Sequence, residues 1–204
     1  MKIVKSTILM TLLFAGVFSG CGGGQGNSTI TTNTSTVVAY QFSATIDSYN
    51  NTEAPFPAAV GDVITGTFSY DSSTAVQKAP AGVQVKMGVI TLNSDLSSFN
   101  RPIAIFNDLQ NFPQRNGSSS PIISDVFQWI TNDTQVAAQY GLDFIQTVIE
   151  LEDQTATAFS TASLPTSLNL NAFTTRTVSL YKQPHGGVSA YFGRAQITSL
   201  TRVQ

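Results

Sequence analysis

The chain has 204 residues, of which only 11% are charged, with ten basic and twelve acidic side chains. Roughly 25% of residues are charged in an average soluble domain. Such sparse charge excludes a long solvated helix, a coiled coil and a nucleic-acid-binding surface, because each of these depends on many charged side chains. The share of Leu, Ile, Val and Phe excludes a wholly disordered chain, and the length fits one domain or two small ones.

The first twenty residues have the layout of a secretory signal. Lys2 and Lys5 form a basic start, and an uncharged, mostly apolar run extends from Ile8 to Phe18. This run is too short to cross a bilayer as a helix, which takes about 20 residues. It has the length of the apolar part of a signal peptide. The sequence therefore predicts a signal peptide over residues 1–20 and an exported protein.

The apolar run ends in Phe18-Ser19-Gly20-Cys21, and Cys21 is the only cysteine in the sequence. This segment resembles the lipobox of bacterial lipoproteins, in which the cysteine is lipidated and becomes the new N-terminus. The resemblance implies lipid attachment at Cys21 and a place in the bacterial cell envelope. By the same resemblance, Gly22 after the cysteine, where known lipoproteins can carry Asp, permits export to the outer membrane, with the domain periplasmic or surface-exposed. Ordinary signal-peptidase cleavage beside an incidental cysteine is the alternative, but exported domains seldom carry a lone unpaired thiol.

A stretch rich in Gly, Ser, Thr and Asn follows Cys21 and continues to Thr36. It carries no charge, and Ile30 is its only large apolar side chain, so it cannot bury enough surface to fold. We expect residues 21–36 to be the lipid-attachment site and a flexible linker, with an end-to-end distance of roughly 20 Å. The predicted folded domain covers residues 37–204. The hydrophobic core must stabilise this domain without a disulfide, because a single cysteine cannot form one within the chain.

Alternation of apolar and polar side chains dominates the predicted domain. Apolar residues stand at every second position from Val38 to Ile46, with Gln41, Ser43 and Thr45 among the residues between them. This is the period of a strand with one buried face. Similar patterns or short apolar runs, separated by turn signals such as His185-Gly186-Gly187, predict further strands over residues 64–70, 83–89, 103–106, 122–130, 144–151, 177–181 and 189–200.

One segment has helical character. Asp133 can cap a helix whose face carries Val136, Ala137 and Tyr140, and Gly141 can end it. Eight or nine short strands with at most one short helix predict an all-β fold, an antiparallel β-sandwich of jelly-roll-like or Ig-like type.

Three short segments stand out in the predicted domain. In chain order they are GTFSYDSST over Gly66–Thr74, SLPTSLNLNAF over Ser163–Phe173, and AQITSLTRV over Ala195–Val203. Together they resemble a group of bacterial exported proteins often found with the PEP-CTERM sorting tail. That group has no characterised function. The resemblance implies an extracytoplasmic β-sandwich and brings with it no catalytic residues and no cofactor.

The residue types argue against nucleophilic or metal-dependent catalysis. His185 is the only histidine and lies in a turn signal, and no Gly-x-Ser-x-Gly segment supplies a nucleophilic serine. Cys21 would be acylated. We therefore predict a non-catalytic surface module, structural, adhesive or ligand-binding, with no cofactor and no metal. Its partners would be the membrane, through the lipid, and a glycan or another envelope protein, but not nucleic acid.

Glu150 and Glu152 support a competing hypothesis. Two residues apart on a predicted strand, they project from one face about 6.5–7 Å apart. This spacing is compatible with the carboxylates of a glycosidase or, together with Asp153, with part of a calcium shell. A solvated strand face, with Ile149 and Leu151 pointing into the core, explains the same pattern. The alternative function is thus a carbohydrate-binding or glycan-hydrolysing protein.

Aromatic side chains offer a second way to bind a glycan. A platform on which sugar rings stack could be formed by five aromatic residues: Trp129, Tyr140, Tyr49, Tyr181 and Tyr191. The apolar neighbours of Trp129 in the sequence are more typical of core packing.

The longest stretch without a periodic pattern extends from Asn107 to Pro121. We expect a loop here, and loops carry many of the ligand-binding groups of sandwich proteins. The polar side chains that suit a hydroxyl-rich ligand are Asp108, Gln110, Asn111, Arg115 and Asn116.

Overall fold

The computed structural model describes residues 36–73, 82–93, 103–111 and 122–203. The chain divides into two units, Met1–Asn33 and Thr34–Gln204, and all of the described residues lie in the second. The elements are β1 (Val37–Tyr49), β2 (Val63–Asp71), β3 (Gly82–Met87), β4 (Ile90–Asn93), β5 (Ile103–Asn111), β6 (Ile122–Asp133), α1 (Thr134–Gln139), β7 (Leu142–Asp153), the 3-10 helix η2 (Leu170–Ala172), β8 (Thr175–Pro184) and β9 (Ala190–Arg202).

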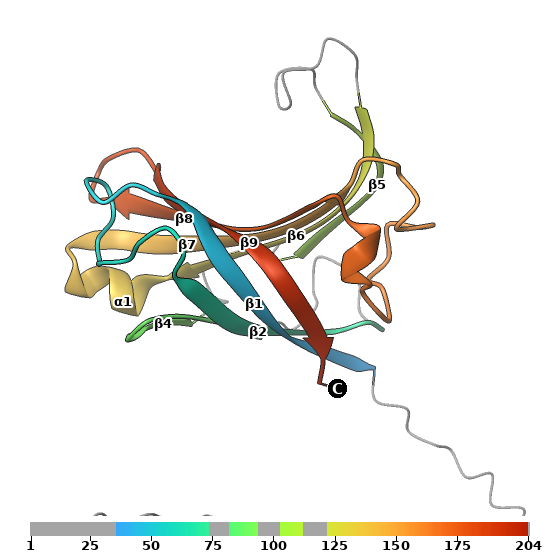
Figure 1. The fold of residues 1–204 in the computed structure, drawn as a ribbon, viewed down its shortest axis with the longest axis horizontal. Helices are drawn as coiled ribbons and strands as arrows, with labels where there is room; N and C mark the ends of the chain where they lie inside the picture. The colour runs from blue at the N-terminus through green and yellow to red at the C-terminus, as the bar shows by residue number, and fades with distance from the viewer. Residues whose placement is uncertain (1–35, 74–81, 94–102, 112–121, 204) are drawn as a thin grey trace, which may run out of the picture. The chain divides into compact units, whose positions relative to one another are not determined.

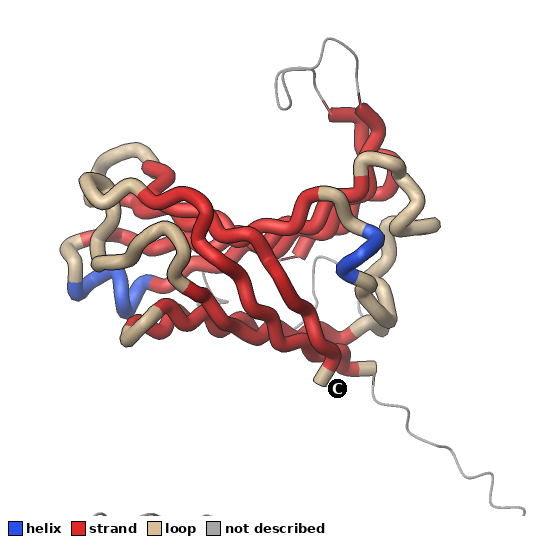
Figure 2. Tube along the Cα trace, in the orientation of Figure 1, coloured by secondary structure: helices blue, strands red, loops and turns tan. Residues whose placement is uncertain are grey.

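The nine strands form one antiparallel sheet in the order β4-β3-β2-β1-β9-β8-β7-β6-β5. All neighbours are consecutive in the chain except β1 and β9, whose pairing joins the first four strands to the last five. The sheet folds over on itself, so that β1 to β4 face β5 to β8 as two layers (Figures 1 and 2). The prediction of an all-β, antiparallel, sandwich-like fold with eight or nine strands and at most one short helix is confirmed, with nine strands and the one short α-helix α1 among the described residues. The edge strands β4 and β5 are not hydrogen-bonded to each other, and the sheet stays open.

Aromatic rings fill the centre of the core between the two layers. The ring of Phe68 lies 5.2 Å from that of Trp129, 5.3 Å from that of Tyr40 and 5.9 Å from that of Phe127, measured between centroids. All four side chains are at most 2% exposed. Burying a large apolar side chain stabilises a domain by about 1.5–3 kcal/mol, so this cluster is a main source of stability.

The helix α1 forms where its sequence signals predict it. The Asp133 carboxylate accepts a hydrogen bond from the Val136 N–H at 2.7 Å, Ala137 is fully buried, and Gly141 has a φ of 68°. A positive φ suits glycine, which has no Cβ to clash, so Gly141 follows the helix without strain. Among the described residues, no helix is long and apolar enough to span a membrane.

The strand predicted over residues 83–89 is in fact two strands and a turn. Gly88 has a φ of 58°, and the chain reverses at Gly88-Val89, so that Met87 pairs with Ile90. The side chain of Val89 is 96% exposed. Val89 is apolar and stands two residues after Met87, so it extends the alternating pattern although it lies in the turn. For this reason the pattern alone predicted one strand and missed both the turn and β4.

The prediction of a loop beginning at Asn107 is wrong. β5 continues to Asn111, so Asp108, Gln110 and Asn111 lie in an edge strand. The pairing of β5 with β6 shifts register between Phe106 and Leu109, and Asp108 has a φ of 55°. A bulge of this kind breaks the two-residue period, which is why the periodic pattern ends at Phe106.

The connection between β7 and β8 is the longest one that the structure describes. It covers one end of the sandwich and is attached there by two buried tyrosines. The Tyr70 hydroxyl donates to the Pro165 carbonyl at 2.9 Å, and the Tyr40 hydroxyl accepts from the Leu168 N–H. Burial raises the pKa of Tyr40, which keeps its hydroxyl neutral.

Candidate functional site

The face of β6 to β9 that points away from the core carries three rows of side chains. Each row crosses the strands, because residues paired in register project from the same side of a sheet. We name the rows after one member each. The Gln128 row is Gln128, Glu150, Thr177 and Gln196; the Val148 row is Ile130, Val148, Ser179 and Arg194; the Tyr181 row is Asn132, Gln146, Tyr181 and Tyr191.

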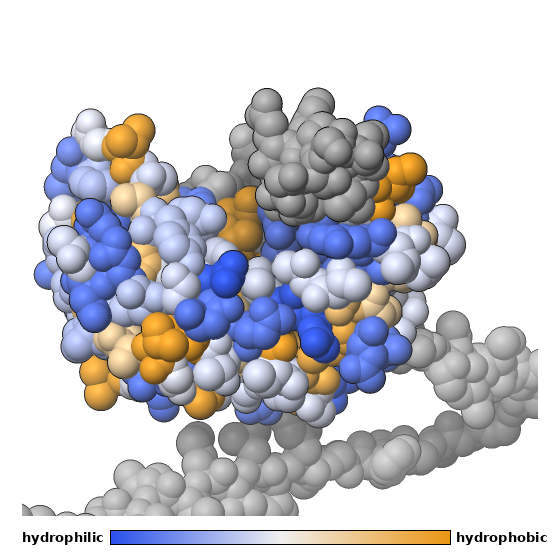
Figure 3. Space-filling model, turned by 45° about the horizontal axis from the view of Figure 1, so that its top comes forward, coloured by the Kyte–Doolittle hydropathy of each residue, from blue (hydrophilic) through white to orange (hydrophobic). Residues whose placement is uncertain are grey.

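These rows lie on a hollowed surface. In Figure 1 the strands β6, β7 and β8 bend upward toward both ends, which makes their outer face concave, whereas β9 descends beside β1 toward the C-terminus. Figure 3 tilts this face toward the viewer, and the part of it that remains visible carries mostly hydrophilic side chains around a small apolar patch. Concave curvature crowds neighbouring side chains. Most members of the rows are accordingly half-buried, Asn132 and Thr177 are buried, and Arg194 and Tyr191 are exposed.

The Gln128 row is polar throughout. The side-chain amide of Gln128 donates to Oε2 of Glu150 at 2.9 Å, which fixes the carboxylate on the face. Glu150 pairs across the strands with Thr177, and Thr177 pairs with Gln196. The row therefore presents amide, carboxylate and hydroxyl groups in sequence across four strands.

Glu150 and Glu152 share a face, as their spacing predicts, but their surroundings differ. Glu152 is only 5% exposed, and Oε1 of its carboxylate accepts a hydrogen bond from the Ser124 hydroxyl at 2.9 Å. Glu150 is half-buried in the Gln128 row. Ile149 and Leu151 point into the core and are at most 1% exposed. The carboxylate of Glu152 thus faces the protein, whereas that of Glu150 lies on the concave face.

The Tyr181 row brings together two of the aromatic side chains that the sequence singles out. The rings of Tyr181 and Tyr191 lie 5.6 Å apart in an edge-to-face arrangement, and Tyr191 is 39% exposed. On the other two strands the side-chain amide of Gln146 donates to Oδ1 of Asn132 at 3.3 Å. This row combines aromatic faces with hydroxyl and amide groups.

The other aromatic residues of the predicted platform lie elsewhere. Trp129 is fully buried, with its ring against Phe68, and therefore belongs to the core. The hydroxyl of Tyr49 donates to the Phe56 carbonyl, and burial raises the pKa of Tyr49 to about 12. Tyr140 packs edge-on against the Phe56 ring. These contacts place Tyr49 and Tyr140 in packing roles outside the three rows.

The Val148 row changes from apolar to polar along its length. Ile130 and Val148 are adjacent on β6 and β7, and Ser179 and Arg194 continue the row on β8 and β9. Nε of Arg194 donates to both carboxylate oxygens of Asp47 on β1, at 3.0 and 3.2 Å. These hydrogen bonds from Arg194 to Asp47 raise the pKa of Arg194. The row lies about 7 Å from each of the two polar rows along the strands.

The polar residues predicted around residues 108–116 are not part of this face. Gln128 pairs with Ala104 of β5, and Asp108 lies in the bulge four residues further along the strand. Gln110 and Asn111 follow at the end of the same edge strand. Arg115, Asn116 and the predicted lipidation site Cys21 lie outside the described residues.

Sequence reasoning missed the buried carboxylate of Asp125 and considered Asp153 only as a possible calcium ligand; the two residues pair across β6 and β7, and both are at most 1% exposed. Asp125 accepts from the Phe159 N–H at 2.7 Å and from the Asp108 N–H at 3.0 Å. Asp153 accepts from the backbone N–H groups of Thr155, Thr157 and Ala158. Both hold the connection after β7 in place. Within the described part of the chain, no group of three or more His, Cys, Asp or Glu side chains could hold a metal ion.

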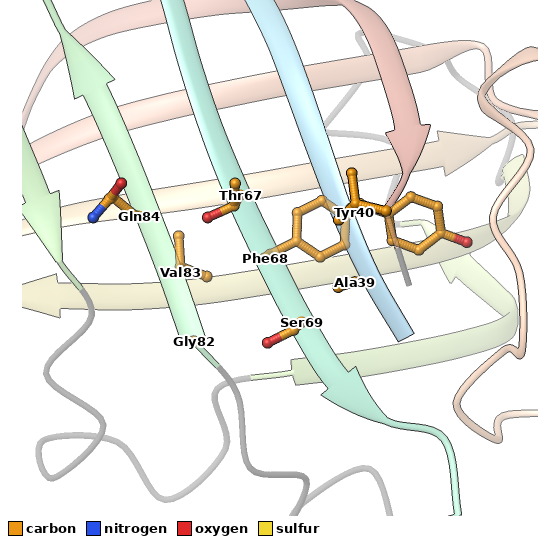
Figure 4. A pocket seen from close by; sticks show the side chains of 9 residues that line it. Ala39, Tyr40, Thr67, Phe68, Ser69, Gly82, Val83 and Gln84 are labelled. Atoms are coloured by element: carbon orange, nitrogen blue, oxygen red, sulfur yellow. The ribbon is translucent and has the colours of Figure 1, made fainter. Parts of the chain in front are cut away.

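Two other hollows lie outside the three rows. One, of about 280 Å³, lies over β1, β2 and β3, where the small residues Ala39, Ser69 and Gly82 stand in register (Figure 4). The other, of about 190 Å³, lies within the connection between β7 and β8 and is lined by hydroxyl-bearing residues such as Ser160 and Thr161. Neither combines aromatic, carboxylate and amide side chains as the outer face of β6 to β9 does.

No protein-family model, no curated protein and no solved structure matches this chain.

Proposed function

We propose that the protein is a non-catalytic, lipid-anchored module of the bacterial cell envelope that binds glycans on the outer face of β6 to β9. The observation that carries the proposal is the order of the rows, with the apolar pair Ile130 and Val148 between two polar rows. A sugar ring has apolar C–H faces and a hydroxyl-bearing edge. It can place a C–H face on the apolar pair while its hydroxyls reach the polar rows on both sides.

The polar rows supply the hydrogen bonds that such a ligand needs. Amides such as those of Gln128 and Gln196 both donate and accept, and the Glu150 carboxylate accepts. The ring of Tyr191 offers an exposed apolar surface with a polar hydroxyl at its tip. A mostly preformed surface with a few fixed polar groups is typical of ligand sites.

The burial of Glu152 supports binding over hydrolysis. Glycosidases place two carboxyl groups on either side of one glycosidic bond. Here the Glu152 carboxylate is engaged by Ser124 and is 5% exposed, so it does not meet a ligand that lies against Glu150.

Glycan binding is tested with detergent-purified protein on a glycan array. We expect binding that falls in Tyr191→Ala and Gln196→Ala, because both remove contacts on the concave face. Thr67→Ala, an exposed change on the outer face of β2, is the matched control and retains binding. An array without any bound glycan contradicts the proposal. Polysaccharide hydrolysis that disappears in Glu150→Gln would show an enzyme instead.

The envelope location rests on the signal-like leader, on the resemblance of Phe18-Ser19-Gly20-Cys21 to a lipobox and on the likeness to exported proteins. We expect the wild-type protein to fractionate with membranes and Cys21→Ser to leave them. The measurement is immunoblotting of membrane and soluble fractions, with globomycin-type inhibition of lipoprotein processing as a second readout. Identical partitioning of both proteins would contradict lipid attachment.

A further inference from the structure

We infer that the ligand of the outer face of β6 to β9 is an uncharged glycan chain lying along the Val148 row, across the strands. The inference rests on the proposed function and adds to it the charge and the direction of the ligand. Two observations carry it: the balance of charges around the three rows, and the position of the apolar pair between the polar ones.

The charges on this face oppose an anionic ligand. Within the three rows, all of them described residues, Arg194 is the only cation, and its guanidinium donates to both oxygens of Asp47. Arg194 and Asp47 thus neutralise each other. The other charged member of the rows is Glu150, a half-buried carboxylate. An anionic polymer would bring its own charges against Glu150, and repulsion between like charges is strong where water is partly excluded.

The same carboxylate favours a ligand that carries hydroxyls and no charge. A hydrogen bond from a sugar hydroxyl to an ionised carboxylate is about twice as strong as one between neutral groups. The Gln128 amide already holds one oxygen of Glu150 in position at 2.9 Å, so the carboxylate is pre-oriented for such a bond. Pre-orientation reduces the entropy lost on binding.

The direction of the chain follows from the geometry of the rows. Neighbouring strands lie about 4.8 Å apart, so a row across four strands extends about 14 Å, enough for more than one sugar ring. The Gln128 and Tyr181 rows flank the Val148 row at about 7 Å on either side. A glycan lying along the Val148 row meets half-buried or exposed polar groups on both flanks at β7 and β9, and on one flank at β6 and β8. A glycan lying along a single strand would contact only one residue of the apolar pair, because Ile130 and Val148 lie on neighbouring strands.

The test is affinity electrophoresis of the full-length protein through gels that contain single polysaccharides. The neutral set is a soluble β-glucan, a galactomannan and an arabinoxylan; the anionic set is alginate, polygalacturonate and chondroitin sulfate. We expect retardation by at least one neutral polymer, little change with added salt, and no retardation by the anionic set. Salt insensitivity follows because no net charge attraction contributes to binding.

Three variants test the position of the chain. Glu150→Gln should weaken binding to the neutral polymer about tenfold, since a charge-assisted hydrogen bond becomes a neutral one. Val148→Asp should abolish binding, because it places a charge in the middle of the row. Val63→Asp, a charge on the outer face of β2 where Val63 is 57% exposed, is the matched control and binds normally. Val148→Thr, similar in shape, tests the same position if the aspartate variant does not fold.

The outcomes separate the two proposals. Retardation by anionic polymers alone would overturn the inference of an uncharged ligand and leave glycan binding intact. Neutral-polymer binding that is unchanged in Glu150→Gln and Val148→Thr would overturn the position along the Val148 row. Retardation by no polymer, neutral or anionic, would contradict the proposed function itself.

Discussion

The side chain of Asp153 is 1% exposed and accepts hydrogen bonds from three backbone N–H groups and the hydroxyls of Thr155 and Thr157. Burial alone would raise the pKa of Asp153. The hydrogen bonds from Thr155 and Thr157 outweigh this effect and lower its pKa to about 2. The native state therefore holds Asp153 in its ionised form.

This pKa predicts how stability depends on pH. An unfolded aspartate has a pKa of about 3.9, so the ionised Asp153 contributes its full stabilisation above about pH 5 and loses it as the pH falls toward 2. We expect Asp153→Asn to lower the free energy of unfolding by about 2–3 kcal/mol at pH 7, and by much less near pH 2.5. Urea unfolding at both pH values measures this difference.

The control for this prediction is Asp143→Asn. Asp143 lies in an exposed pair with His185, and such surface pairs contribute about 0–1 kcal/mol. A destabilisation by Asp153→Asn that is equal at pH 7 and pH 2.5 would show that shape, not charge, determines the role of this residue.

Among the elements, the short edge strand β4 depends on a group from the opposite layer. Its residue Asn93 pairs with Gln84 of β3, and the Asn93 N–H donates to Oδ2 of Asp133 at 2.7 Å. Oδ1 of the same carboxylate accepts from the Val136 N–H at the start of α1. One side chain thus satisfies an edge-strand donor and caps a helix. An unsatisfied edge N–H is otherwise open to pairing with another chain.

Replacing this carboxylate tests the link between the layers. We expect Asp133→Ala to cost about 1–2 kcal/mol of unfolding free energy and to speed hydrogen exchange at the Asn93 amide more than tenfold. Asp62→Ala removes a comparable bond to the Ala59 N–H in the connection between β1 and β2, and should leave Asn93 unchanged. Equal exchange at Asn93 in wild type and Asp133→Ala would contradict the role of Asp133 in holding β4. Amide exchange followed by NMR or mass spectrometry gives the comparison.

On the scale of the whole molecule, the pairing of β1 with β9 unites the sheet. Tyr40 pairs with Arg202, and the Val203 N–H donates to the Ala39 carbonyl at 2.8 Å. The start of β1 and the end of β9 therefore lie side by side at one end of the sandwich (Figure 1). The hairpins on either side of this pairing are local, whereas the pairing itself joins residues far apart in the sequence.

A circular permutant tests this organisation. Joining Val203 to Thr36 by a short Gly-Ser linker and opening the chain between Gly88 and Val89 keeps every strand intact. We expect this permutant to unfold cooperatively, with the far-UV circular dichroism of the parent. Opening between Val148 and Ile149 instead cuts a central strand and should abolish folding. If both permutants fold equally well, the continuity of β7 is not needed for the sheet.

The sequence by itself determined the elements that obey local rules. Alternation located most strands because a strand with one buried face exposes every second side chain to water, whatever it pairs with. The helix α1 was predictable for the same reason, since the cap at Asp133 and the stop at Gly141 act within a few residues. Glu150 was singled out correctly as a residue on a strand face, but its neighbours were unknown.

Only the tertiary structure decided which side chains share a surface. Gln128 meets Glu150 because β6 pairs with β7 in one particular register, and Thr177 joins them through a second such pairing. Nothing local in the sequence encodes these registers. The same holds for Glu152, whose burial depends on Ser124 from another strand, and for the bulge at Asp108. The two-residue period shows on which face of its strand a residue lies. The residues beside it on that face depend on the register of strand pairing, and this register is determined by the packing of the whole core.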